Sequence, residues 1–572
     1  MPRNLEELLG EINTAISPGF RGRLVQRGLA RGLVWNAGTL PPGAPQFSLR
    51  LSGELLAYGL GLFRLALSLR DSDRNHALLP NAFERAAEAI EAVVRNGDPA
   101  WPERGFYTMV ASSAYHLGHF SARAFSLFGG TARDLNLSPS EAVLRHLLVR
   151  DITGLHAALV TWAQEGIGFD AALARKLDQS SEGLDFNHAL HLALTTLFHR
   201  AVAQYDHALE AGDAASRQAA LDSLNEGIST AAEFRHVPFY WLYTIARHLL
   251  DDLWDHCLHV RLPMPLNDPP DSQWDRLRRL FIALVSRRTP AELDLWPSQL
   301  DAAQRSLDVR DDLVVALPTS AGKTRVAELC ILRALSLGQR VVFVTPLRAL
   351  SAQTERTLRR TFVPLGFSVS SLYGSSGATG DDLDSLANRD VVVSTPEKLD
   401  FALRNDPSLL EKVGLVVLDE GHSIGAGERE VRYEVLVQRL LRRTDAAQRR
   451  VVCLSAMLPP GDQLDDFTAW LRQDEPGQAI RSEWRPTRQR FGEIVWLGQQ
   501  ARLNFRVGND RPFVPSFLTA KIPSQGRRRT PFPKNGQELT LASAWQFIAQ
   551  GQTVLIYCPQ RRSVEPLASE GV

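Results

Sequence analysis

The chain has few cysteines, and none of them are close together. Its 572 residues include four cysteines, Cys257, Cys330, Cys453 and Cys558, with no C-x-x-C pair among them. Three of the four lie in apolar helix or strand patterns, which is typical of reduced, buried thiols in a cytosolic protein.

Long hydrophobic runs are also missing. The most apolar stretch, residues 55–69, is interrupted by Arg64 and is shorter than the roughly 20 residues that a membrane-spanning helix needs. The first residues are charged and amphipathic and do not resemble a signal peptide. We therefore expect a cytoplasmic protein with no membrane contact.

Neither sign of charge dominates the chain. Lysine and arginine total 64, and aspartate and glutamate also total 64. No overall field attracts nucleic acid, so any such binding depends on local patches. The length predicts three or four domains of roughly 100–200 residues each.

Residues 1–285 carry a helical pattern. Segments such as 84–95 and 216–233 repeat apolar residues at i, i+3, i+4 and i+7. We expect an all-α domain, either an irregular bundle or an α-solenoid, and the lack of a clear 34-residue register favours the bundle. Histidine pairs at i, i+3 spacing, such as His256 and His259, lack further ligands at a recognisable spacing and indicate structural roles.

From residue 286 the pattern changes to alternating strands and helices. The alternation predicts an α/β domain over residues 286–480 with a parallel, doubly wound sheet. In such sheets ligands bind at the carboxyl ends of the strands, and every chemical motif below follows a strand. The expected strands are Leu313–Ala316, Arg340–Thr345, Val391–Ser394, Leu415–Leu418 and Arg450–Leu454.

Residues 481–572 begin a further unit. Val554–Tyr557 is expected to form another buried strand, and a polar, proline-containing insertion precedes it. The insertion contains the basic run Arg527–Arg529, which is either a solvated loop or a contact to a nucleic-acid backbone.

A phosphate-binding loop is predicted at Ala316–Thr324, ALPTSAGKT. It follows an apolar strand and precedes a helical pattern, so the N–H groups of a helix N-terminus would face the phosphates. Lys323 would neutralise the β- and γ-phosphates, and the Thr324 hydroxyl would bind Mg²⁺. Leu317 occupies the position of the usual first glycine, so the segment alone is a weak signal. The other expected ATP contacts are Thr319, Ser320, Ala321 and Gly322.

The segment Leu415–His422, LVVLDEGH, strengthens this interpretation. It is a buried-strand pattern that ends in two carboxylates. Asp419 would hold Mg²⁺, and Glu420 would orient and deprotonate the attacking water. With Lys323 these are the expected catalytic residues, and ATP and Mg²⁺ are the expected cofactors.

The motifs between about Trp296 and Val572 resemble those of superfamily 2 helicases of the DExH kind. The likeness is greatest to the branch that contains the Ski-type RNA helicases and the related archaeal and eukaryotic DNA-repair helicases. It implies a RecA-like core in residues 286–480 and part of a second RecA-like domain in residues 481–572. The segments, in order, are LWPSQ (Q motif), LPTSAGKT (I), TPLRALSAQ (Ia), STPEKLDFALRN (Ib), DEGH (II), LSAM (III), SEWRP (the link between the RecA-like domains) and VLIYCPQRR (IV).

The resemblance implies further residues at the nucleotide site. Gln299 would read the adenine. His422 and Ser455 would couple the nucleotide to the nucleic acid as the cleft closes. Met457 replaces the threonine that usually ends motif III, which removes a hydroxyl at the coupling position.

The resemblance also implies a path for single-stranded DNA or RNA, with movement from 3′ to 5′. Helix starts at strand ends would present N–H and basic groups to phosphates, so binding would not depend on sequence. DNA and RNA both stay open, because no pattern that reads the 2′-OH is recognisable. The expected contacts are Pro346 and Arg348 in motif Ia and Thr395, Pro396 and Lys398 in motif Ib.

The chain stops at Val572, just after motif IV, without the motifs V and VI that supply arginine fingers in this family. We therefore expect a fragment, a truncated product or one half of a split protein. The first hypothesis is an ATP-dependent helicase or translocase, with a role in DNA repair or anti-phage defence. The alternative is a non-catalytic module that binds nucleotide and nucleic acid while its helical domain binds a partner protein. A P-loop enzyme for a small molecule would leave motifs Ia and Ib unexplained.

Overall fold

The computed structural model describes residues 4–17, 19–34, 50–95, 101–131, 135–164, 186–262, 264–265, 268–269, 271–372, 388–424, 427–456, 461–487, 491–506, 513–522, 530–549, 551–558, 560 and 564. The chain divides into two compact units. One comprises Met1–Gly118, Leu127–Asn136 and Arg488–Val572, and the other His119–Ser126 and Leu137–Thr487. The domain boundaries expected near residues 285 and 480 stay predictions.

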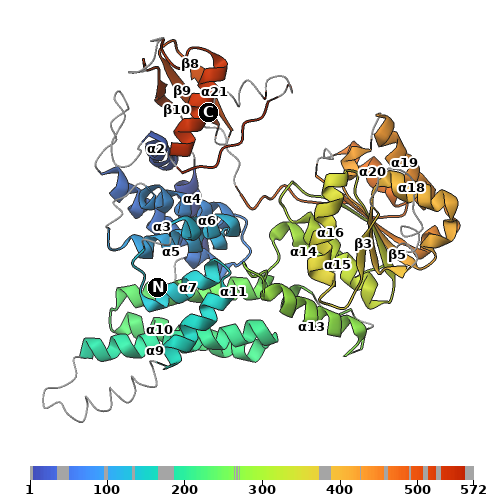
Figure 1. Cartoon of the computed structure of the whole chain (residues 1–572). Helices are drawn as coiled ribbons and strands as arrows, with labels where there is room; N and C mark the ends of the chain where they lie inside the picture. The colour runs from blue at the N-terminus through green and yellow to red at the C-terminus, as the bar shows by residue number, and fades with distance from the viewer. Residues whose placement is uncertain are drawn as a thin grey trace. The chain divides into compact units, whose positions relative to one another are not determined.

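Helices make up the N-terminal part of the first unit (Figure 1). α3 packs against α4 at Gly59, where an added Cβ would lie 2.7 Å from Ile90 Cγ1. The missing side chain lets the two helices approach closely. The rings of Phe63 in α3 and Phe83 in α4 also contact each other, with centroids 5.9 Å apart. The helices are α1 (Leu5–Ile16), α2 (Phe20–Val34), α3 (Leu51–Ser72), α4 (Leu79–Val94) and α5 (Arg104–Leu117).

A small antiparallel sheet belongs to the same unit. Its order is β10-β9-β8, and Leu503, Val514 and Phe517 form its buried face. Phe547 packs on Phe517 with ring centroids 5.4 Å apart. The elements are β8 (Phe491–Trp496), β9 (Gln500–Arg506), β10 (Phe513–Thr519) and the helix α21 (Gly536–Ala549).

The prediction of a buried strand at Val554–Tyr557 is wrong. No strand forms there, and Leu555 and Tyr557 are 94% and 84% exposed. An apolar run becomes a strand of a parallel sheet only where neighbouring strands supply hydrogen-bond partners and helices cover both faces. Among the described residues no strand pairs with this run.

The second unit begins with helices and confirms the expected all-α character of the N-terminal region. α10 starts at the N-cap Asp213, whose carboxylate accepts hydrogen bonds from the N–H groups of Ala215 and Ser216 at 3.0 and 3.1 Å. α9 and α11 both pack against α10. The helices are α6 (Ser121–Thr131), which crosses the boundary between the units, α7 (Pro139–Leu148), α9 (Phe186–Ala211), α10 (Ala214–Glu233), α11 (Val237–His256), α12 (Leu258–Arg261) and α13 (Gln273–Ser286).

A seven-stranded parallel sheet follows in the same unit and confirms the predicted α/β core (Figure 1). The strand order is β3-β4-β2-β5-β6-β1-β7. Val344 pairs with both Ser394 and Leu418, and Ala316 pairs with Ser455, so the carboxyl ends lie along one edge. The strands are β1 (Leu313–Ala316), β2 (Arg340–Val344), β3 (Val369–Ser371), β4 (Val391–Ser394), β5 (Val413–Leu418), β6 (Arg450–Ser455) and β7 (Ile480–Arg481).

Helices cover both faces of this sheet. Alternate strand residues point to opposite faces, so Leu313 and Val315 join one core while Val314 joins the other. The first core includes α13, α14 (Pro297–Ser306), α15 (Lys323–Ser336) and α16 (Arg348–Phe362). The second includes α18 (Pro396–Asn405), α19 (Glu428–Leu441) and α20 (Asp462–Leu471).

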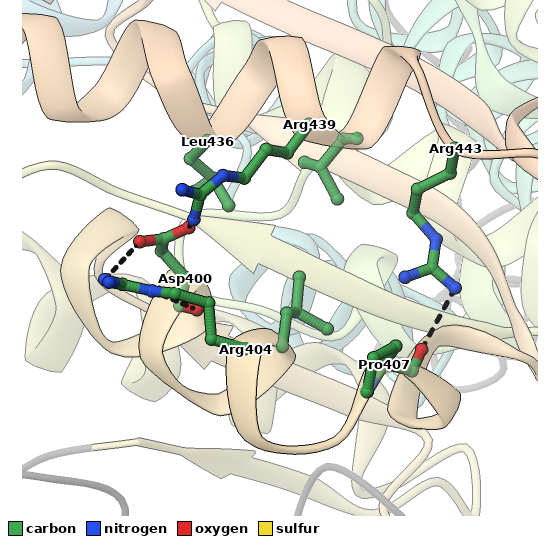
Figure 2. A pocket seen from close by; sticks show the side chains of 8 residues that line it. Asp400, Arg404, Pro407, Leu436, Arg439 and Arg443 are labelled. Carbon is green, nitrogen blue, oxygen red and sulfur yellow. Dashed lines mark hydrogen bonds and ion pairs between the residues drawn. The ribbon is translucent and has the colours of Figure 1, made fainter.

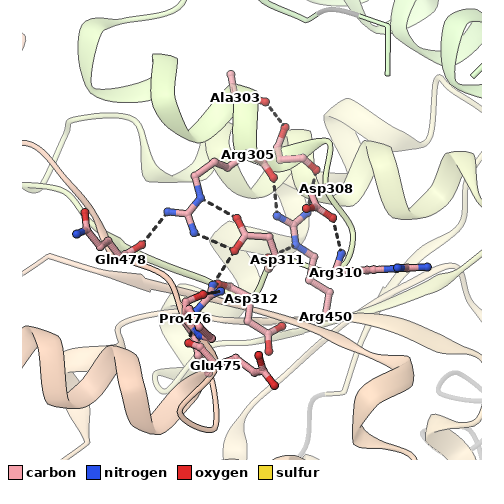
Figure 3. Close-up of polar contacts among 12 residues, drawn as sticks. Ala303, Arg305, Asp308, Arg310, Asp311, Asp312, Arg450, Glu475, Pro476 and Gln478 are labelled. Atoms are coloured by element: carbon pink, nitrogen blue, oxygen red, sulfur yellow. Dashed lines mark hydrogen bonds and ion pairs between the residues drawn. The ribbon is translucent and has the colours of Figure 1, made fainter. Parts of the chain in front are cut away.

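A network of hydrogen bonds and ion pairs joins the start of β6 to the segment before β1, at the amino-terminal edge of the sheet (Figure 3). The buried guanidinium of Arg450 donates to the carbonyl oxygens of Asp311, Ser306 and Arg305 at 2.8, 2.8 and 2.9 Å. The Asp311 carboxylate accepts from Arg305 and from Arg472. Burial raises the pKa of Asp311, but these two guanidiniums outweigh it and hold the pKa below its ordinary value.

A cavity of about 160 Å³ lies between α18 and α19 (Figure 2). The Asp400 carboxylate accepts from Arg404 at 2.6 Å and also from Arg439. Arg443 donates to the Pro407 carbonyl oxygen at 3.0 Å. Arg404 and Arg439 are exposed, so water screens their charges.

The described helices include none long and apolar enough to cross a membrane. None of the four cysteines, all of which lie in the described part of the chain, forms a disulfide bond. Cys257, Cys330 and Cys453 are buried, as predicted, and Cys558 is partly exposed.

Candidate nucleotide-binding site

The loop between β1 and α15 has the backbone of a phosphate-binding turn. Ser320 and Gly322 are left-handed, with φ of 69° and 87°, so the chain reverses tightly before α15 begins at Lys323. Residue 322 favours glycine because of this positive φ, and an added Cβ would also displace the Gln299 amide, whose Nε2 would lie 1.9 Å away. Thr319 and Ser320 are exposed, whereas Ala321 is buried.

Leu317, at the position of the usual first glycine, packs into the core of the unit. Its side chain is fully buried in the core beneath α15. Its N–H donates to the Ser455 carbonyl oxygen at 3.0 Å, which continues the pairing of β1 with β6. The side chain at this position therefore packs into the core and does not fill the space enclosed by the loop.

Lys323 and the acidic pair lie close together. Lys323 Nζ donates to the Leu317 carbonyl oxygen at 3.3 Å. Burial lowers the pKa of Lys323 below its ordinary value, and the charges of Glu420 and Asp419 offset only part of this effect. Burial and the Glu420 charge raise the pKa of Asp419 to about 6, against the opposing effect of Lys323. The two predicted motifs thus form one electrostatic site.

The turn after β5 orients the carboxylates. The Asp419 N–H donates to the Val344 carbonyl oxygen at 2.8 Å, and the Asp419 carbonyl oxygen accepts from the Tyr433 hydroxyl at 2.9 Å. Glu420 is left-handed, with φ 53° and ψ 48°, a conformation that costs a non-glycine residue about 1 kcal/mol or more. Gly421 packs on β6, because an added Cβ would lie 2.4 Å from Cys453 Sγ.

His422 lies between the acidic turn and the end of β6. Its Nδ1 is 3.3 Å from Glu420 Oε2 and 3.5 Å from Ser455 Oγ. Ser455 is fully buried, and its carbonyl oxygen accepts the Leu317 N–H. A continuous chain of contacts therefore joins Glu420 to the phosphate-binding loop. Met457 lies outside the described residues.

Gln299 is buried at the start of α14 and contacts the loop. Its Oε1 accepts from the Trp296 N–H at 2.9 Å, and its Nε2 donates to the Gly322 carbonyl oxygen at 3.2 Å. Ser298, which the sequence did not single out, donates from its hydroxyl to the Ala321 carbonyl oxygen at 2.8 Å. The two bonds hold α14 against the loop, and the reading of adenine by Gln299 stays a prediction.

The residues predicted to contact nucleic acid follow two neighbouring strands. The Thr345 N–H, at the end of β2, donates to the Ser394 carbonyl oxygen of β4 at 2.9 Å. α16 begins at Arg348 and α18 at Pro396, so two helix N-termini lie at this edge of the sheet. Pro346, Thr395 and Pro396 are buried, and Lys398 is partly exposed, while the side chain of Arg348 lies outside the described part.

Residues 296–467 match the DEAD/DEAH box helicase family. These residues form a DEAD/DEAH box helicase domain. The match confirms the resemblance to superfamily 2 helicases, and it contains every predicted site residue from Gln299 to Ser455.

Curated relatives extend the comparison. The chain is 26% identical over 485 residues to the Hachiman protein HamB of Bacillus cereus, which covers 83% of this chain and 41% of the relative. It is 28% identical over 273 residues to the ATP-dependent DNA helicase Hel308 of Thermococcus kodakarensis, covering 48% of this chain and 20% of the relative. It is 32% identical over 204 residues to Hel308 of Pyrococcus abyssi, covering 35% and 26%.

The predicted branch with archaeal DNA-repair helicases is therefore confirmed. The chain spans less than half the length of these relatives. The alignment with HamB is long enough to extend well into the N-terminal helices, which the motif resemblance did not cover.

Proposed function

We propose that this chain is the ATP-binding part of a motor that hydrolyses ATP and moves along single-stranded nucleic acid. The observation that carries the proposal is that the charges of Lys323, Asp419 and Glu420 act on one another at one site. His422 contacts Glu420 on one side and Ser455 on the other. The helicase family implies ATP, and the Hel308 relatives carry the name ATP-dependent DNA helicase.

The residues present fit magnesium and a triphosphate. The left-handed turn at Ser320 and Gly322 suits backbone N–H groups that face phosphates, and Lys323 adds a positive charge. The Thr324 hydroxyl and the Asp419 carboxylate are oxygen donors of the kind that Mg²⁺ prefers. The bound ion would neutralise the charge that develops on the phosphates during transfer.

The acidic turn would supply the base. Glu420 would orient a water molecule and accept its proton. Its left-handed backbone supports this role, because strained conformations of this kind cluster at functional sites. His422 contacts both Glu420 and Ser455, so a movement of Glu420 would displace His422 and, through it, Ser455. The Ser455 carbonyl oxygen accepts from the Leu317 N–H at the start of the loop.

Single-stranded DNA is the polymer that we propose, because the Hel308 relatives are named DNA helicases. The strand would cross the helix N-termini at Arg348 and Pro396, with Pro346, Thr395 and Lys398 beside it, and would move from 3′ to 5′. The role in DNA repair or anti-phage defence, the cytoplasmic location and a protein partner on the N-terminal helices stay predictions.

The test is ATP hydrolysis by the full chain with Mg²⁺, with and without single-stranded DNA. Turnover that rises with DNA and vanishes in Lys323→Ala supports the motor. ATP binding without turnover, in the wild type as in Glu420→Gln, supports the non-catalytic module instead. Matched RNA oligonucleotides in the same assay decide between the two polymers.

A further inference from the structure

A cavity of about 340 Å³ adjoins the phosphate-binding loop. Its loop side consists of Ala316, Leu317 and Pro318, and Ala456 lines it after β6. The remaining wall is Arg481 at the end of β7 and, after it, Ser482, Glu483 and Arg485. Ser482, Glu483 and Arg485 belong to the SEWRP motif, for which the proposed mechanism has no chemical role so far.

Two contacts hold this segment beside the loop. β7 pairs with β1 in parallel, with Ala316 opposite Arg481. The ring of Trp484 lies against Trp296 with centroids 5.6 Å apart, and Trp296 precedes the helix whose Gln299 bonds to the loop. The position of Arg485 is therefore set by the fold of this unit.

The charges along the wall are not balanced. Arg481 is paired with Glu483 at 2.5 Å. Arg485 is partly buried, and no ion pair or hydrogen bond joins it to any other residue that the structure describes. A partly desolvated guanidinium without an anion favours binding of an anionic ligand, and its planar donors match phosphate oxygens.

One residue of the cavity wall is contacted by the lysine of the loop. Lys323 Nζ donates to the carbonyl oxygen of Leu317, a residue that lines the cavity. In a phosphate-binding loop the backbone N–H groups hold the α- and β-phosphates, and the lysine reaches the β- and γ-phosphates. Arg485 lines this cavity together with Leu317, the residue whose carbonyl oxygen Lys323 contacts.

We propose that Arg485 binds the terminal phosphate of the bound nucleoside triphosphate and so distinguishes ATP from ADP. The proposal rests on the proposed function. Because Arg485 follows the last strand of this sheet, its contact with the phosphate would also tie the position of the segment after β7 to the presence of ATP.

The experiment measures the affinity of the full chain for a fluorescent N-methylanthraniloyl-ATP with Mg²⁺, and its displacement by ATP and by ADP. Arg485→Ala should weaken ATP binding by roughly 10-fold or more, which is the loss of one charge-assisted contact, and ADP binding by less than about 3-fold. Arg485→Lys should recover part of the ATP affinity, because it restores the charge without the planar donors.

Arg432→Ala is the matched control, because Arg432 is an exposed arginine of α19 paired only within its own helix. It should change neither affinity. Equal ATP affinities in Arg485→Ala and the wild type would overturn the proposal, and so would equal losses for ATP and ADP. A wild-type chain that binds no fluorescent ATP, or Lys323→Ala that binds it normally, would instead overturn the proposed function.

Discussion

Replacing Leu317 with glycine restores the usual loop sequence and should nevertheless damage the protein. The Leu317 side chain is fully buried in the core beneath α15. Deleting a buried leucine side chain costs about 2–5 kcal/mol, and glycine adds roughly 0.5–1 kcal/mol of backbone entropy. We expect a destabilisation of about 3–5 kcal/mol and no gain in ATP affinity.

Thermal unfolding of the full chain, followed by circular dichroism, measures this effect. For a unit of this size the midpoint should fall by roughly 4–7 °C. Leu337→Gly is the matched control, because Leu337 caps the same helix and is 46% exposed, and it should lower the midpoint by no more than about 2 °C. An unchanged midpoint together with tighter ATP binding in Leu317→Gly would show that the leucine side chain faces the phosphates.

Three further predictions concern the base and the polar contacts. Glu420→Gln should keep ATP affinity and lower turnover by about 100-fold or more, and normal turnover in a steady-state ATPase assay would assign the base elsewhere. In urea titrations, Arg450→Ala should lower the free energy of unfolding by about 3 kcal/mol or more, because the carbonyls of Ser306, Asp311 and Arg305 lose a buried donor. Asp400→Asn should lower it by less than about 1 kcal/mol, because its arginine partners are exposed, and equal losses would contradict this reasoning. Because the pKa of Asp311 is lowered on folding, its stabilisation is complete above about pH 4 and is lost as the pH falls further, so Asp311→Asn should destabilise the protein at pH 7 and much less at pH 3.

The central strands and their chemistry were predictable from the sequence. Each combines a β-branched run with a motif at its carboxyl end, and parallel order brings those ends to one edge. The edge strands β3 and β7 were missed because they have three and two residues, too few for a pattern. Their conformation comes from pairing with β4 and β1.

The side-chain contacts of the site were less predictable. The motif spacing predicted that Lys323 and Asp419 lie at the same edge of the sheet. It could not show that the Leu317 side chain turns into the core, or that the oxygen and the nitrogen of the Gln299 amide both form hydrogen bonds within the chain. The orientation of a side chain and its hydrogen-bond partners depend on which groups the packed fold places next to it. The run Val554–Tyr557 shows the converse, because apolar composition alone does not make a strand without neighbours.

The left-handed backbone at Glu420 has a consequence for the balance between activity and robustness. Asparagine and glycine adopt this conformation with less strain than glutamate does. Either replacement would abolish the carboxylate and at the same time relieve the turn. A catalytically dead protein that melts at a higher temperature than the functional one is therefore the expected product, as in other enzymes whose reactive geometry opposes stability.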